Sequence, residues 1–181
     1  MEIGKKLTAR DRKQWRAWLV QHAHTEKEIW LVYFNKHSAK KSISYDAAVE
    51  EALCFGWIDS TVKKINDESR AQRFTPRRKK SEFSELNKVR VEKMIKQKKM
   101  TKQGLESLKH VKKSPEIGED IYLALKKDVC VWKHFSGFSE DYKRIRLAWI
   151  ESARSQPEEF TKRLSYFVKK TRQGKMYGTI P

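Results

Sequence analysis

The chain has 181 residues, of which 38% are hydrophobic and 11% aromatic, enough for one sizeable core or two small ones, so disorder is not expected. No apolar run approaches the ~20 residues that span a bilayer, so no membrane span is expected. The first twenty residues contain no uninterrupted apolar core of the kind found in secretory signals, which predicts a cytoplasmic location.

The formal net charge of +18 is concentrated in the middle of the chain. Residues 61–113 carry 18 Lys and Arg against 6 Asp and Glu, which is two thirds of the excess. Such a patch attracts nucleic acids and other polyanions, and it also keeps a protein soluble.

The N-terminal part is expected to alternate helix and strand. Thr8 is placed to cap a first helix. The apolar face of this helix consists of Trp15, Trp18, Leu19 and His22, which recur at helical spacing. The run "IWLVYF", residues 29–34, is short, uninterrupted and rich in β-branched and aromatic residues, so it predicts a buried strand.

A second helix is predicted between Ser44 and Gly56. Ser44 is a capping residue, Asp46 suits the positive end of the helix dipole, and Gly56 suits a left-handed residue at the C-terminus. Its apolar stripe is Tyr45, Ala48, Val49, Ala52 and Leu53. Residues 57–65 and a segment near 71–75 then read as strands that are joined by the turn "NDES".

Ser81 is predicted to open a long helix. Its apolar stripe is Phe83, Leu86, Val91, Met94 and Ile95. Asn87 and Arg90 fall on the same stripe, where an unpartnered polar group would cost about 1–3 kcal/mol. These two side chains are therefore candidates for a site or a buried network. Thr101 is expected to cap a short helix after it.

The segment "VKKSPEIGED" contains the Pro and Gly of a boundary, which is placed near residue 114. Beyond it, helices are predicted over residues 117–127, 139–154 and 157–173, with Pro157 in a first turn. We therefore predict a predominantly helical α+β protein. Residues 1–113 form a small antiparallel sheet packed by helices, and residues 114–181 form an all-helical unit.

No motif for a cofactor or metal is present. The chain lacks a phosphate-binding glycine loop, a nucleophile elbow and a zinc signature, so no cofactor and no metal is expected. Cys54 and Cys130 stand among apolar neighbours without metal-ligand spacing, and both are predicted to be reduced core thiols.

The basic stretch "RFTPRRKKS", residues 73–81, follows the motif "FGWIDS" in the expected sheet. Strand alternation sends Arg73 and Phe74 to opposite faces, and Arg77 is expected to reach toward Asp59. Asp59 is either a general base among aromatics or the salt-bridge partner of an arginine, and the second reading is favoured. Arg78, Lys79 and Lys80 are expected to be solvated.

Three runs resemble the YdeI/OmpD-associated family, also labelled bacteriocin-protection proteins: "SISYDAAVEEALCFGWIDS", "RFTPRRKKSEFSELN" and "MTKQG". The similarity extends from about Trp15 to Tyr177 and includes "RLAWIESAR" near the C-terminus. The resemblance implies a link to resistance against envelope-active peptides and to an outer-membrane porin, and it carries over no catalytic residue. The chain departs from the family pattern at Glu158, Glu159 and Phe160, where the family tends to have a Glu-Thr-Arg group.

These observations favour a stress- or resistance-associated protein that binds an anionic small molecule or an acidic protein partner, rather than an enzyme. The expected binding residues are Trp57, Asp59, Arg73, Arg77, Asn87 and Arg90. One alternative is sequence-independent nucleic-acid binding through the middle segment. Its basic helix face is made by Lys88, Lys96 and Lys99, and a face of this kind is more often plain solvated surface than a nucleic-acid contact. Another is an enzyme for a phosphorylated or carboxylated small molecule, with Asp59 as base and a concave pocket lined by Trp57.

Overall fold

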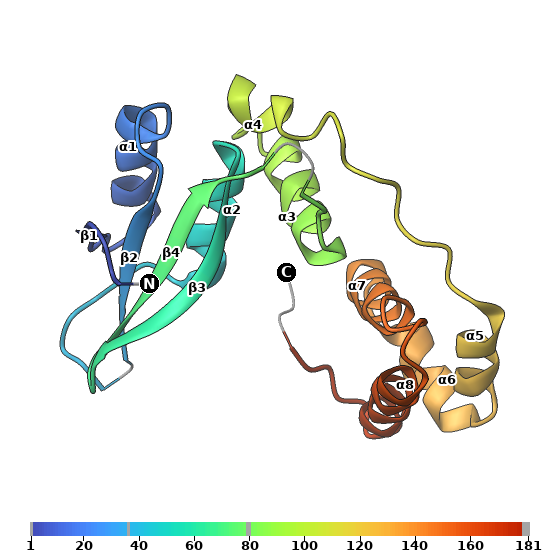
Figure 1. Ribbon diagram of the computed structural model, residues 1–181. Helices are drawn as coiled ribbons and strands as arrows, with labels where there is room; N and C mark the ends of the chain where they lie inside the picture. The colour runs from blue at the N-terminus through green and yellow to red at the C-terminus, as the bar shows by residue number, and fades with distance from the viewer. Residues whose placement is uncertain (1, 36, 79–80, 179–181) are drawn as a thin grey trace. The chain divides into compact units, whose positions relative to one another are not determined.

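The structure is a computed structural model that describes residues 2–35, 37–78 and 81–178 (Figure 1). The chain divides into two compact units. The first comprises Met1–Glu82 and Arg90–Val111, and the second comprises Phe83–Val89 and Lys112–Pro181. Each unit is described by itself below.

The first unit contains a four-stranded sheet in the order β1-β2-β4-β3. Its strands are β1 (Lys6–Leu7), β2 (Ile29–Phe34), β3 (Trp57–Asn66) and β4 (Ser69–Pro76). The β2–β4 and β4–β3 pairs are antiparallel, whereas β1 is parallel to β2. The α+β class is confirmed, but the prediction of a purely antiparallel sheet is wrong, because a two-residue strand leaves no alternation pattern in the sequence.

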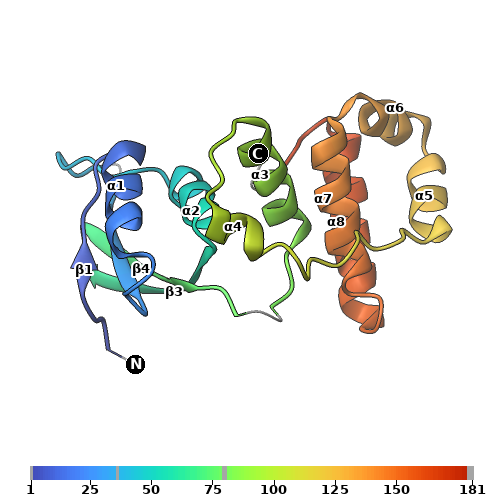
Figure 2. The ribbon, with the colours of Figure 1, turned by 90° about the horizontal axis from the view of Figure 1, so that it is seen from above.

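Helices α1 (Arg12–His22) and α2 (Tyr45–Cys54) lie on the same side of this sheet (Figure 2). The Trp15 indole packs 5.4 Å from the Phe74 ring of β4, and its Nε1 donates to the Ala48 carbonyl oxygen of α2 at 3.0 Å. One fully buried indole thus connects the sheet to both helices.

The helix caps differ in how well the sequence predicts them. Ser44 accepts from the Ala47 N–H and Gly56 has a φ of 72°, so both predicted ends of α2 are confirmed. The predicted Thr8 cap of α1 is wrong, because Asp11 is the residue whose side chain accepts from the Gln14 N–H.

Helix α3 (Glu85–Lys96) begins four residues after the predicted start at Ser81, and α4 (Lys102–Glu106) follows it. The carbonyl oxygens of Ser81 and Glu82 accept from the Arg77 guanidinium instead of from a following helical turn. Thr101 accepts from the Gly104 N–H, which confirms its predicted role as the cap of α4.

The second unit is all-helical in its C-terminal part, as expected. Its helices are α5 (Glu119–Lys126), α6 (Val129–Gly137), α7 (Glu140–Glu151) and α8 (Pro157–Arg172). Their core includes Ile121, Leu125, Val131, Phe135, Tyr142, Ile150 and Phe167. Helix α6 was not predicted, because its β-branched and aromatic residues do not favour helix; the Asp128 side chain starts it by accepting from the N–H groups of Cys130 and Val131.

Both cysteines are free thiols, as predicted, but only Cys54 is buried. The prediction that Cys130 belongs to the core is wrong. The buried face of α6 is formed by Val131 and Phe135, which are four residues apart, and Cys130 lies outside this face.

Within residues 2–35, 37–78 and 81–178, no helix has the length and apolar character needed to cross a bilayer. The same residues contain no group of three or more His, Cys, Asp or Glu side chains arranged to hold a metal ion.

Candidate functional site

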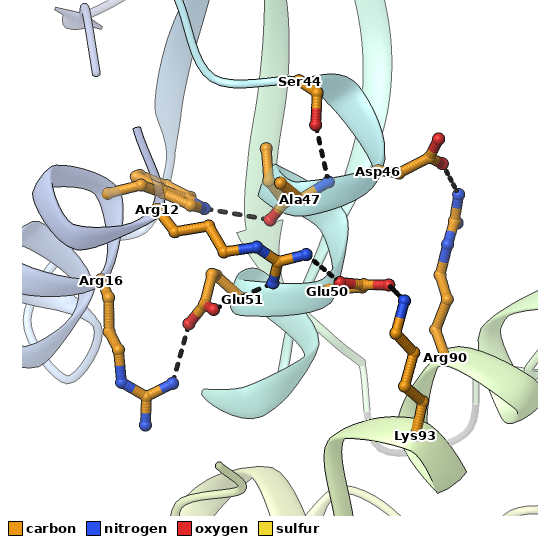
Figure 3. A network of polar contacts seen from close by, with 11 residues as sticks. Arg12, Arg16, Ser44, Asp46, Ala47, Glu50, Glu51, Arg90 and Lys93 are labelled. Carbon is orange, nitrogen blue, oxygen red and sulfur yellow. Dashed lines mark hydrogen bonds and ion pairs between the residues drawn. The ribbon is translucent and has the colours of Figure 1, made fainter. Parts of the chain in front are cut away.

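Two buried acids on α2, Glu50 and Glu51, form the centre of an ionic network that sequence reasoning missed (Figure 3). Glu50 accepts from Arg12 of α1 and from Lys93 of α3, the latter at 2.7 Å. Glu51 accepts from Arg12 at 3.1 Å and from Arg16 at 2.7 Å. The network holds α1 and the C-terminal part of α3 against α2. Its signal in the sequence is an adjacent pair of acids in the middle of a helix whose neighbouring residues are apolar.

The network predicts a specific pH dependence of stability. Burial alone raises the pKa of Glu50, but hydrogen bonds from Lys93 and Arg12 outweigh it and hold the pKa below its usual range. The unfolded chain therefore binds this proton more readily than the folded chain does. The resulting stabilisation is present above the unfolded pKa, about 4.3, and is lost as the pH falls through the folded pKa.

We expect Glu50→Gln to lower the free energy of unfolding at pH 7 by about 1–3 kcal/mol, and the difference from the parent to shrink at pH 3. Urea unfolding at the two pH values measures this. Glu106→Gln is the matched control, since the Glu106–Lys109 pair is exposed. If Glu50→Gln lowered the free energy of unfolding by the same amount at both pH values, the ionic assignment would be contradicted.

Among the predicted site residues, Asp59 and Arg90 are brought together around Tyr45. The Tyr45 hydroxyl donates to Asp59 Oδ2 at 2.7 Å, and Gln72 Nε2 donates to the same oxygen at 3.2 Å. The Arg90 guanidinium lies 5.7 Å from the centre of the Tyr45 ring and forms an ion pair with Asp46. We refer to Tyr33, Tyr45, Asp46, Asp59, Gln72 and Arg90 as the Tyr45 cluster.

Strand register explains why the sheet residues of the Tyr45 cluster share one face. Asp59 is opposite Phe74, and Phe74 packs against α1, so both face the helices. Gln72 lies two residues from Phe74 on the same strand, and Tyr33 lies opposite Arg70. Alternation therefore directs all of these side chains to the helix-covered side of the sheet.

Tyr33 is the least expected member of the cluster. Tyr33 is only 4% exposed, and its hydroxyl has no hydrogen-bond partner among the described residues. Burial raises the pKa of Tyr33 well above its usual range, with Asp59 and Tyr45 nearby adding to the rise. Because an unsatisfied buried hydroxyl costs about 1–3 kcal/mol, this group marks a point where a bound molecule could form a hydrogen bond.

Tyr45 is a neutral donor at physiological pH. Burial, followed by its hydrogen bond to Asp59, raises the pKa of Tyr45 to about 12. Its side chain is nevertheless partly open to solvent, since the residue is 38% exposed. The Tyr45 cluster thus combines two phenols, a fixed carboxylate and a buried guanidinium at a position that solvent can reach.

Arg77 interacts electrostatically with Asp59 of the Tyr45 cluster. Burial lowers the pKa of Arg77, and the negative charge of Asp59 partly opposes that shift. Its guanidinium donates to the Glu82 carbonyl oxygen at 2.9 Å. Of the neighbouring cations, Arg78 is exposed as predicted, whereas Lys79 and Lys80 lie outside the described residues.

The other three predicted site residues lie elsewhere. Trp57 is fully buried and donates from Nε1 to the Ala23 carbonyl oxygen at 3.1 Å, so it lines no open pocket. Arg73 points to the face opposite Phe74, where its Nε donates to Glu28 Oε2 at 2.8 Å. Asn87 belongs to the second unit.

The lysines of the predicted basic helix face have different environments. The Lys88 ammonium is 2.5 Å from the buried carboxylate of Glu85, so Lys88 is not a solvated charge. Lys96 is exposed, and Lys99 is partly buried with its carbonyl oxygen accepting from Arg16. These three residues therefore do not form a uniform basic surface.

The structure is that of a two-unit α+β protein in which a tyrosine–carboxylate–arginine cluster is formed by the N-terminal sheet, α2 and α3. Residues 7–107 match the family model described as Domain of unknown function (DUF8412), and the chain belongs to this family. Residues 114–174 match the family model described as Bacteriocin-protection, YdeI or OmpD-Associated, which confirms the family resemblance for this part of the chain. No curated protein and no solved structure has a significant match to the chain.

Proposed function

We propose that the protein binds a small anionic ligand at the Tyr45 cluster and that this binding contributes to protection against bacteriocins. The observation that carries the proposal is the buried hydroxyl of Tyr33, which has no partner among the described residues and lies near Asp59 and Tyr45. The net charge of +18 favours the approach of an anion. The link to bacteriocins rests on the description of the family that residues 114–174 match.

Arg90 and Asp46 supply the means of binding. The Arg90 side chain is 3% exposed, whereas the carboxylate side chain of Asp46 is 53% exposed. A buried guanidinium is unstable without an acidic partner, whereas an exposed carboxylate can rotate away from the ion pair and be hydrated by solvent. A carboxylate or phosphate ligand therefore takes the place of Asp46 beside Arg90, and the guanidinium keeps an anionic partner throughout.

The phenols provide the remaining contacts. The Tyr33 hydroxyl donates a hydrogen bond to the ligand, and the partly exposed Tyr45 ring forms one side of the site. Asp59 holds the Tyr45 hydroxyl in place and is itself fixed by Gln72. The N-terminus of α2, where Asp46 lies in the first turn, adds the favourable end of a helix dipole.

Titration with inorganic phosphate, followed by NMR chemical shifts, tests this assignment. Asp46→Asn is expected to tighten phosphate binding by about two- to fivefold, because it removes the competing carboxylate. Arg90→Met is expected to abolish binding. Arg73→Met is the control, since Arg73 lies on the other face of the sheet. Unchanged affinity in both Asp46→Asn and Arg90→Met would overturn the assignment.

The protective role is tested separately in bacteria that are sensitive to a bacteriocin and that produce the protein. Survival is expected to rise with the parent chain and with Arg73→Met, and not with Arg90→Met. Equal survival with all three chains, together with loss of phosphate binding in Arg90→Met, would retain the binding site and reject its role in protection.

A further inference from the structure

The second unit contains a pocket of its own, which is independent of the Tyr45 cluster. Its volume is about 320 Å³, at the small end of the ~300–1,000 Å³ that ligand pockets occupy. The pocket is lined from the segment before α5 and from α5, α6 and α7, and every lining residue lies between Ser114 and Ala148. It therefore falls wholly within the segment that matches the YdeI/OmpD-associated family model.

One wall of the pocket is apolar and rigid. It is formed by Ile117, Tyr122, Phe135 and Leu147. Phe135 and Leu147 are also members of the buried core, with exposures of 5% and 4%. Because Phe135 and Leu147 are held by core packing and Ile117 and Tyr122 pack against that core, the wall suits a flat aromatic or compact aliphatic group.

The two cations of the pocket differ in how firmly each is neutralised. Arg144 Nε donates to Glu85 Oε2 at 2.8 Å, and the Ser114 hydroxyl donates to the same oxygen at 2.8 Å. The Glu85 side chain is only 6% exposed, and hydrogen bonds from Lys88, Ser114 and Arg144 outweigh its burial and lower its pKa. Arg144 is therefore paired with Glu85, a buried carboxylate that other hydrogen bonds hold in place.

Lys143 has a different environment. Its side chain is 15% exposed, and its ammonium lies 5.6 Å from the centre of the Phe135 ring. Its acidic partner is Glu140, 2.5 Å away, and the Glu140 side chain is 88% exposed. The largely buried Lys143 side chain is thus paired with the exposed carboxylate of Glu140, which can rotate away and be hydrated. Another carboxylate can replace Glu140 without leaving the ammonium unpaired.

We propose that this pocket binds a small monocarboxylate with an aromatic or compact apolar body. The carboxylate pairs with Lys143 Nζ in place of Glu140, and the body packs against Phe135, Tyr122 and Leu147. Arg144 stays bound to Glu85 and shapes the polar rim. The proposal concerns a different unit and different residues from the site at Tyr45, and its ligand needs an apolar group beside the carboxylate, so either proposal can fail without the other.

Benzoate is the probe, with benzamide as its neutral isostere and acetate as an anion without a body. In the parent chain, benzoate is expected to shift the amide NMR signals of α6 and α7, with little response to benzamide or acetate. Lys143→Met, which keeps the stem over Phe135, is expected to weaken benzoate binding about tenfold, and Glu140→Gln is expected to tighten it.

Lys133→Met is the matched control, because Lys133 is exposed on α6 and does not line the pocket. The opposite effects of Lys143→Met and Glu140→Gln distinguish a site from general loss of structure. Absence of benzoate binding at millimolar concentration, equal binding of benzamide, or unchanged affinity in Lys143→Met would each overturn the proposal.

Discussion

Replacing Trp57 by alanine is expected to lower the free energy of unfolding by about 3–5 kcal/mol, the range for truncating a buried tryptophan. The Trp57 indole has no exposed surface and meets the Trp18 ring edge-on, with 5.8 Å between the ring centres. The substitution also removes the donor to the Ala23 carbonyl oxygen. Trp57 thus lies in the core, and we expect its effect on stability to exceed any effect on ligand binding.

Urea denaturation measures this effect, with Val62→Ala on the same strand as the control. Val62 is 51% exposed, so its truncation is expected to change stability by less than about 0.5 kcal/mol. Trp57→Phe keeps a ring in the core and is expected to bind phosphate like the parent. A folded Trp57→Phe protein that no longer binds phosphate would instead place Trp57 in the site.

Gly104→Ala is expected to lower the free energy of unfolding by about 3 kcal/mol or more, at the upper end for overpacking. A Cβ at this position would lie 2.1 Å from the Cys54 carbonyl oxygen and 2.7 Å from its carbonyl carbon. The backbone cannot easily withdraw, because the Thr101 hydroxyl and N–H both donate to that same Cys54 oxygen. A glycine is therefore required where α4 approaches the end of α2.

Gly137→Ala is the matched control at another helix. A Cβ there meets no described heavy atom within 4 Å, so this substitution is expected to be neutral or slightly stabilising. Thermal unfolding of the two variants separates steric overlap from the general effect of replacing glycine. Equal melting temperatures for Gly104→Ala and Gly137→Ala would contradict the close approach.

Elements with local signals were predictable from the sequence. Ser44 and Gly56 set the ends of α2 through a side-chain cap and a positive φ, and the short run "IWLVYF" favoured a buried strand through its β-branched and aromatic residues. β1 and α6 lacked such signals. β1 exists only through its pairing with β2, and α6 depends on the Asp128 cap and on core packing against neighbouring helices.

The candidate site was predictable only in part. Asp59 and Arg90 were found because polar residues next to a tight turn or on an apolar helix stripe need an explanation. Tyr33 and Tyr45 were missed because each fits an apolar pattern, one within a buried strand and one on a helix stripe. Each residue belongs to the candidate site because of where the tertiary structure places its hydroxyl group. The hydrophobic periodicity of the sequence does not show that placement.

At the proposed site, a bound anion accepts a hydrogen bond from the buried Tyr33 hydroxyl. Tyr33→Phe removes this hydroxyl and keeps the ring, so the most direct measurement is the phosphate affinity and the melting temperature of this variant beside the parent. We expect Tyr33→Phe to have an equal or higher melting temperature without ligand and to bind phosphate more weakly by about fivefold or more. Phosphate affinity equal to that of the parent would contradict the claim and leave the Tyr33 hydroxyl without a role in binding.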